Sequence, residues 1–242
     1  MRTPETLLRH QAVWRSKAVL RALYRDWYEE IASYLRSGPT LEVGGGTGNL
    51  KEFAPQVICT DVVRVPWLDA VADAQRLPIA TGRLANVVLF DVLHHIENVR
   101  LFFDEAVRVL QPGGRIVVMD PYISWLSWPV YHYLHQEPVD FTQDPLRLQP
   151  PQADRAPFDA NQAAATMLFE RGYDAFCRQY PQLDKLVHRR LAFFAYPLSG
   201  GFEHPSILPI SFVGPLLALE RALGFLDWVL AFRILVVLEK TR

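Results

Sequence analysis

The stretch Leu41-Glu42-Val43-Gly44-Gly45-Gly46-Thr47-Gly48-Asn49-Leu50 decides how the rest of the chain is interpreted. Residues 41–43 are predicted to end a buried strand. The glycines that follow lack a Cβ atom, so their backbone can take positive φ angles and approach a ligand closely. If Asn49 opens a helix, as the apolar Leu50 and Phe53 indicate, the free N–H groups of its first turn point at a bound polar molecule. The stretch therefore predicts a strand, a glycine turn and a helix that bind a ligand together.

Two classes of cofactor use such a turn, and the spacing of the glycines separates them. The dinucleotide fingerprint places a third glycine where this chain has Asn49. Glu42, just before the first glycine, would repel a pyrophosphate and attract an ammonium group. The motif therefore favours a cofactor with an amino-acid end. A dinucleotide cofactor, or a glycine turn with no ligand at all, remains as an alternative.

The run from Glu42 to Gly48 resembles motif I of the class I S-adenosylmethionine (SAM) dependent methyltransferases, in particular the type 11-like bacterial enzymes that act on small molecules. Asp61 ends the next predicted strand, 57–61, at the distance where α/β nucleotide-binding units place the acid that accepts the ribose hydroxyls. Asp73-Ala74, shortly before Leu77-Pro78, is similar to the pair that lies beside the adenine in this family. A simple turn leading into Pro78 explains Asp73 equally well.

The resemblance implies that the cofactor is SAM, with S-adenosylhomocysteine as its product. The residues that it places at the cofactor are Glu42, Gly44, Gly45, Gly46, Asn49, Asp61, Val62, Asp73, Ala74, Asp91 and Leu93.

The apolar run 85–91 predicts a strand buried in a parallel sheet. The residues after it, 92–98, resemble the family's loop where the active site meets the sulfonium. Two adjacent histidines are not expected to face the same way, and by position His95 is our candidate catalytic base, while His94 is expected to pack or bond locally. An imidazole titrates near neutrality and can take a proton from an attacking hydroxyl or amine. A histidine that only positions the loop is the alternative for His95.

Five strand-like segments alternate with helices between residues 40 and 120, which predicts an α/β, doubly wound, parallel sheet. The resemblance extends this to a mainly parallel seven-stranded Rossmann-like methyltransferase fold with a helical and loop cap over the carboxyl ends of the strands. Outside this core the sequence predicts a helix over 6–36, a helix from Asp159 to Cys177, a sixth strand over 187–196 and an antiparallel seventh strand over 234–239.

We expect one domain over 1–242, with four parts. Residues 1–37 form an N-terminal helical cover, 38–120 the SAM-binding core, 121–215 a substrate cap, and 216–242 the final helix and strand. Prolines from Pro138 to Pro157 punctuate a long loop that we expect to order over the substrate. The cap is rich in aromatic residues, which suit a large or aromatic acceptor. Candidate substrate residues are Tyr24, Tyr28, His94, Tyr122, Trp125 and His204, the last with Glu203 as a second acid-base pair.

Composition restricts the partners. The 242 residues carry 25 Lys+Arg against 26 Asp+Glu, so the chain has no basic field for a nucleic-acid backbone. The two cysteines, Cys59 and Cys177, form neither a disulfide framework nor a zinc-binding spacing, so we expect a cytoplasmic protein without a metal. The N-terminal sequence lacks the apolar centre of a signal peptide. The apolar segment 207–232 is interrupted by prolines and charges, so we expect burial within the domain and no membrane span, with room for a peripheral membrane contact.

The sequence therefore predicts a SAM-dependent methyltransferase that acts on an O or N atom of a small or lipid-like acceptor, as a monomer or homodimer. A non-catalytic SAM-binding or scaffold protein and an NAD(P)-dependent oxidoreductase are the alternatives.

Overall fold

The computed structural model describes residues 4–150 and 159–241, and its centre is a seven-stranded sheet in the order β3-β2-β1-β4-β5-β7-β6. The strands are β1 Thr40–Val43, β2 Ile58–Asp61, β3 Ala70–Val71, β4 Leu84–Phe90, β5 Leu110–Pro121, β6 Leu183–Leu191 and β7 Arg233–Lys240. The first five strands pair in parallel, and β7 runs antiparallel between β5 and β6. The predicted sheet, with its antiparallel last strand, is confirmed.

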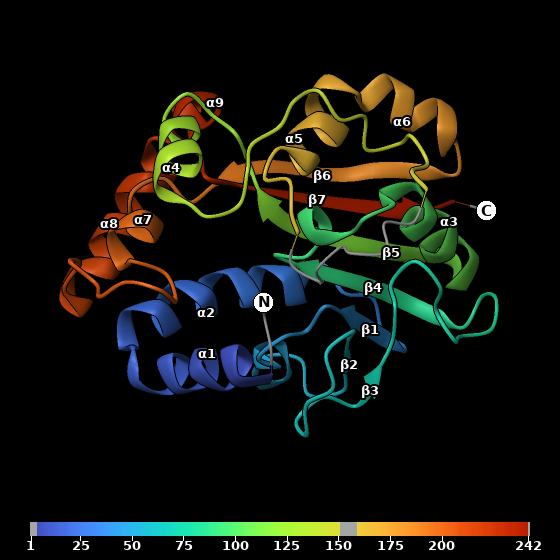
Figure 1. Ribbon diagram of the computed structural model, residues 1–242, viewed down its shortest axis with the longest axis horizontal. Helices are drawn as coiled ribbons and strands as arrows, with labels where there is room; N and C mark the ends of the chain where they lie inside the picture. The colour runs from blue at the N-terminus through green and yellow to red at the C-terminus, as the bar shows by residue number, and fades with distance from the viewer. Residues whose placement is uncertain (1–3, 151–158, 242) are drawn as a thin grey trace.

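Helices cover both faces of this sheet (Figure 1). They are α1 Pro4–Ser16, α2 Ala18–Ser33, α3 Val99–Val109, α4 Ser127–Leu134, α5 Ala164–Thr166, α6 Tyr173–Gln179, α7 Ala195–Ser199, α8 Ile210–Ala222 and α9 Asp227–Leu230. Alternation along β4 separates the two cores, because successive side chains of a strand point to opposite faces. Val87 and Leu89 pack with α3 and α6, whereas Val88 and Phe90 pack with α2.

Several predicted helices are shorter than expected. The helix over 6–36 is two helices that meet at Lys17, and Asn49 opens only a 3-10 turn, η1 (Asn49–Glu52). Within residues 40–121, all of which the structure describes, α3 is the one α-helix, so regular alternation of strands and helices is wrong for this part of the chain. Loops and 3-10 turns make the other connections between its parallel strands.

Two boundaries in the second half also differ from the prediction. The sixth strand ends at Leu191 because Ala192 takes a positive φ of 62°, and the chain then forms α7. The helix predicted from Asp159 to Cys177 is divided into α5, a π turn η3 (Met167–Arg171) and α6. Asn161, and not Asp159, accepts the N–H of Ala163 at the start of α5 (3.0 Å).

The prediction that the apolar segment 207–232 is buried within the domain is also wrong. Helix α8 lies at one end of the molecule (Figure 1) and buries only Val213 and Glu220 of its own residues. Phe212 is 61% exposed, and most of the other apolar side chains of α8 face solvent as well. The domain boundary expected at residue 216 falls inside this helix. Among the described residues, no helix is both long enough and apolar enough to span a bilayer.

Candidate functional site

The glycine turn begins directly after β1 and lies against the end of β4. Gly44 has a positive φ of 67°, and a Cβ atom at this position would lie 2.3 Å from the side chain of Val92. Any other residue at position 44 would therefore push the turn away from β4. The turn curls back on itself, since the N–H of Gly48 donates to the carbonyl of Gly45 (2.7 Å).

Two carboxylates flank this turn from neighbouring strands. The Oε2 atom of Glu42 accepts the S–H of Cys59 (2.8 Å) and lies 3.0 Å from the place where a Cβ atom of Gly45 would be. Asp61 accepts the N–H groups of Gly46 (3.0 Å) and Val63 (2.9 Å). Strands β1 and β2 thus bring Glu42 and Asp61 to one turn, as a shared cofactor site requires.

Burial raises the pKa of Glu42 to about 7. The hydrogen bond from Cys59 opposes this rise, and the negative charge of Asp61 adds to it. An ammonium group placed beside Glu42 would favour its ionised form, because opposite charges at close range attract. Glu42 is therefore arranged to gain charge when a cation binds near it.

The other predicted cofactor residues surround the same strand ends. Val62 is 50% exposed immediately after Asp61, while Asn49 and Leu93 are buried. The Oδ1 atom of Asp73 accepts the N–H of Gln75 (2.9 Å), which is the local turn that the sequence left open as the alternative for Asp73. Ala74 packs on the edge of the core.

Asp91 has a partner that the sequence did not indicate. It follows β4 with a positive φ of 56°, and its carboxylate pairs with the guanidinium of Arg233 at the start of β7. Arg233 is 1% exposed and lies over the rings of Tyr196 (4.4 Å) and Trp27 (4.6 Å). Burial on its own would lower the pKa of Arg233, but Asp91 together with the hydroxyl groups of Tyr196 and Tyr24 raises it, so Asp91 faces a permanent buried cation. An arginine that opens an apolar strand was the only sequence feature pointing to this pair.

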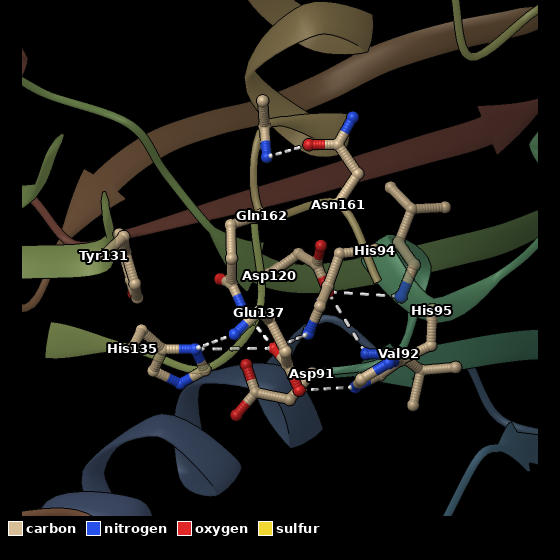
Figure 2. A network of polar contacts seen from close by, with 12 residues as sticks. Asp91, Val92, His94, His95, Asp120, Tyr131, His135, Glu137, Asn161 and Gln162 are labelled. Carbon is tan, nitrogen blue, oxygen red and sulfur yellow. Dashed lines mark hydrogen bonds and ion pairs between the residues drawn. The ribbon is translucent and has the colours of Figure 1, made fainter. Parts of the chain in front are cut away.

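A second polar cluster forms at the turn after Asp91, shown in Figure 2. Residues Leu93–His95 make a 3-10 turn, η2, that aims both imidazoles at the carboxylate of Glu137. His94 Nε2 lies 3.5 Å from Glu137 Oε2, and His95 Nε2 lies 3.7 Å from Glu137 Oε1. The prediction that the two adjacent histidines face different ways is therefore wrong. A tight turn, unlike a strand, lets neighbouring side chains converge.

Two members of this His94–His95–Glu137 cluster, His94 and Glu137, are held by hydrogen bonds from behind. The N–H of Asn161 donates to the carbonyl of His94 (2.9 Å), and the side chain of Gln162 donates to Glu137. The Oδ1 atom of Asp120 lies 3.0 Å from His94 Nδ1 and accepts the backbone N–H groups of residues 92 and 93 (3.1 Å each). Hydrogen bonds from Asn161 and Gln162 of the cap thus hold Glu137 beside η2. Sequence reasoning missed the contact between Glu137 and the two histidines because His94 and His95 are more than 40 residues away from Glu137 in the chain.

Burial and neighbouring charges shift the pKa values of the buried groups in this cluster. Burial on its own would lower the pKa of His94, but the carboxylates of Asp120 and Glu137 raise it to about 10. Burial would raise the pKa of Glu137, yet the hydrogen bond and charge of His94, with the charges of His95 and His135, lower it to about 2. Near neutral pH His94 is therefore cationic and Glu137 is ionised, whereas burial raises the pKa of Asp120.

The predicted substrate residues fall into separate places. Tyr24 and Tyr28 are buried against Phe90, with ring centroids 5.3 and 4.9 Å away, at the end of β4. Tyr122 is buried beneath Arg190, whose guanidinium carbon lies 5.4 Å from its ring, and Trp125 is 77% exposed.

The second acid-base pair does not join the cluster. Glu203 forms ion pairs with Arg9 and His10 of α1, and the carbonyl of His204 accepts from Lys17 (2.6 Å). Of the predicted substrate residues, His94 thus belongs to the His94–His95–Glu137 cluster. Tyr24 and Tyr28 lie against Phe90 at the end of β4, the strand that precedes this cluster. The loop predicted to close over the substrate runs to Pro157, and its residues 151–158 lie outside the described residues.

A cavity of about 320 Å³ lies on the outer side of the glycine turn. It is lined by Gln11, Trp14, Arg15, Arg21, Thr47, Gly48, Asn49, Glu52 and Trp67. Only Asn49 of the predicted cofactor residues borders it, so this cavity is not the space between Glu42 and Asp61.

Residues 41–118 match a family model described as "Methyltransferase domain". Solved structures share the fold. One is a possible histamine N-methyltransferase, SAM-dependent, from Thermotoga maritima, with 14% identity, 99% of this chain and 97% of that chain covered, and a TM-score of 0.58. Another is a SAM-dependent methyltransferase from Archaeoglobus fulgidus, with 12% identity, 91% and 94% covered, and a TM-score of 0.56. No curated protein matches the sequence closely enough to count as a relative.

The matched segment runs from β1 almost to the end of β5 and contains the glycine turn, both flanking carboxylates and η2. Residues 41–118 thus match a methyltransferase domain by sequence, and the chain as a whole shares the fold of solved SAM-dependent methyltransferases.

Proposed function

We propose that this chain binds SAM at the glycine turn and transfers its methyl group to an O or N atom of a small or lipid-like acceptor held at the His94–His95–Glu137 cluster. The contact between Gly44 and Val92 supports this most directly, because it joins the turn to the residue that precedes η2. Donor and acceptor groups would then lie on either side of the end of β4.

On the donor side, Glu42 takes the amino group of the methionine end, and its ionisation on binding supplies a charge-assisted bond. Gly44, Gly45 and Gly46 admit the methionine backbone. Asp61 takes the ribose hydroxyls, for which it would exchange one of its present N–H donors. The remaining positions carry over from the family resemblance and stay predictions: Asn49, Val62, Asp73, Ala74, Asp91 and Leu93.

On the acceptor side, transfer is an in-line displacement. The lone pair of the acceptor atom forms a bond to the methyl carbon while the S–CH₃ bond breaks, and its electron pair stays on sulfur to give S-adenosylhomocysteine. The protein has mainly to align the two reactants and exclude water. His95 takes the acceptor proton, with Glu137 oriented to stabilise the imidazolium that forms.

Exposed apolar side chains favour a lipid-like acceptor within this class. A groove of about 450 Å³ on and before α8 is lined by Leu208, Pro209, Phe212, Pro215, Leu216 and Leu219. Apolar patches of this kind on soluble proteins commonly mark sites of interaction. A peripheral membrane contact through α8 would give the cap access to a membrane-embedded acceptor.

The test is methyl transfer from labelled SAM to a panel of phenols, carboxylic acids, amines and lipid extracts, followed by label in the product and by release of S-adenosylhomocysteine. We expect acceptor-dependent turnover and a loss of about 100-fold or more in His95→Gln, because general-base catalysis contributes about that much. His132→Gln, an exposed histidine stacked on Trp128, is the matched control. Tight SAM binding with no transfer to any acceptor would instead identify a non-catalytic SAM-binding protein.

A further inference from the structure

The spacing of ligand atoms in the His94–His95–Glu137 cluster fits a metal ion. One ring nitrogen of each histidine and one carboxylate oxygen of Glu137 lie within 4.8 Å of one another. The two nitrogen–oxygen separations, 3.5 and 3.7 Å, are longer than the about 2.7–3.2 Å of a well-formed hydrogen bond. Ligands at about 2.0–2.1 Å from a tetrahedral zinc ion are themselves about 3.4 Å apart. The two separations between histidine and Glu137 are therefore close to those that a shared ion requires, and the ligand atoms of the two histidines lie within 4.8 Å of each other.

The groups behind these side chains are those that metal ligands use. Asp120 engages His94 at Nδ1 (3.0 Å), so the ring directs Nε2 at Glu137. A carboxylate behind the far nitrogen of a metal-binding histidine fixes its orientation and raises its basicity. Gln162 orients Glu137 in the same way. The side chains of His94, His95 and Glu137 are 4%, 8% and 17% exposed, so few water molecules would compete with a bound ion.

The donor set selects the kind of ion. Two imidazoles and one carboxylate suit a divalent first-row transition metal, whereas magnesium and calcium prefer oxygen ligands throughout. His135 lies 3.7 Å from Glu137 but accepts the N–H of that residue at Nδ1 (3.3 Å), so this nitrogen is already engaged. Three protein ligands leave a coordination position open, which is typical of catalytic rather than structural zinc sites.

We propose that His94, His95 and Glu137 bind one divalent transition-metal ion, such as Zn²⁺, with an open position for an acceptor oxygen. The sequence did not indicate a metal, because the two histidines are adjacent and Glu137 is remote in the chain. Binding of the ion stands on geometry alone, whereas its use by the acceptor rests on the proposed methyl transfer.

In the metal-bound state His95 is a ligand, so the base role proposed for His95 above applies to the protein without the ion. The ion acidifies the coordinated acceptor hydroxyl, whose proton leaves to solvent before the oxygen attacks the methyl carbon.

The test is titration of the full chain, first treated with a chelator, with Zn²⁺ in competition with a chromophoric indicator. We expect one ion per chain, and binding at least 100-fold weaker in both His95→Gln and Glu137→Gln, while His132→Gln binds like the unaltered protein. Circular dichroism reports whether each variant is folded. Should a variant fail to fold, Co²⁺ added to the unaltered protein must give the visible absorption bands of a low-symmetry nitrogen–oxygen site.

Less than one equivalent of bound Zn²⁺ at saturation would overturn the proposal, as would equal affinity in both variants or a Co²⁺ spectrum like that of the hydrated ion. SAM binding to the metal-free protein is measured separately by calorimetry. SAM binding without Zn²⁺ binding rejects only the metal site, and Zn²⁺ binding without SAM binding rejects only the methyltransferase function.

Discussion

Replacing Glu42 by Gln tests whether burial raises the pKa of this carboxyl group and so makes the stability of the protein depend on pH. In the folded protein the pKa of Glu42 is raised from 4.5 to about 7, chiefly by burial. A carboxyl group with a raised pKa binds more protons in the folded than in the unfolded chain, so the free energy of unfolding falls as pH rises between the two values. At about 1.4 kcal/mol per pKa unit, the ionised side chain costs about 2 to 3 kcal/mol of stability at pH 8 relative to pH 5.

The glutamine variant should lack this cost. Gln has the same shape, and its amide oxygen can still accept the S–H of Cys59. Urea unfolding of both proteins at pH 5 and pH 8 isolates the effect, because contributions of other groups cancel in the difference. We expect the unaltered protein to lose about 2 to 3 kcal/mol more than Glu42→Gln over this range. Glu29→Gln, on the exposed side of α2, should behave like the unaltered protein.

The same group links SAM binding to protons. At pH 7 about half of the chains carry a protonated Glu42, and an ammonium beside it drives ionisation, so SAM binding should release about 0.5 proton from this residue. Calorimetry in buffers of different ionisation enthalpy measures this number, and Glu42→Gln should not show it. If the free energy of unfolding changed equally with pH in both proteins, the raised pKa of Glu42 would be refuted. SAM binding with the same proton release in both would refute its role beside the amino group.

Three further substitutions test other parts of the molecule. Asp61→Asn should weaken SAM binding about 10- to 100-fold in calorimetry, since it removes a charged acceptor of hydrogen bonds; unchanged affinity would contradict its role at the ribose. Asp91→Asn leaves Arg233 as an unpaired buried cation and should cost about 3 kcal/mol in urea unfolding, whereas Asp26→Asn, in an exposed ion pair, should cost less than about 1 kcal/mol. Equal losses of unfolding free energy in the two variants would show that the buried ion pair contributes no more to stability than the exposed one. Phe212→Ser on α8 should reduce co-sedimentation with phospholipid vesicles without changing SAM affinity, and undiminished co-sedimentation would argue against a membrane contact through this helix.

The meeting of Glu42 and Asp61 at the glycine turn could be predicted because it is local in sequence. Glycines with positive φ, a strand before them and an acid at the end of the next strand are readable from residues 41–61 alone. The parallel order of strands follows from the same pattern together with the family resemblance. Asp61 and Glu42 meet at one turn because neighbouring parallel strands end at the same edge of the sheet.

The His94–His95–Glu137 cluster could not be predicted, because it depends on contacts that are distant along the chain. Hydrogen bonds of Asn161 and Gln162 hold Glu137 and its loop beside η2. No short-range sequence pattern indicates these contacts. The convergence of His94 and His95 depends on a 3-10 turn in a stretch whose apolar residues indicated only the end of a strand. Exposure of α8 escaped prediction for a related reason, since composition indicates that a segment is apolar but not what covers it.

The measurement that bears most directly on a SAM site between Glu42 and Asp61 is calorimetric titration of the full chain with SAM, S-adenosylhomocysteine and NADH at pH 8. We expect one equivalent of SAM and of S-adenosylhomocysteine to bind, with both weakened in Asp61→Asn, and no heat of binding from NADH. Saturable binding of NADH with none of SAM would contradict the assignment of this pocket.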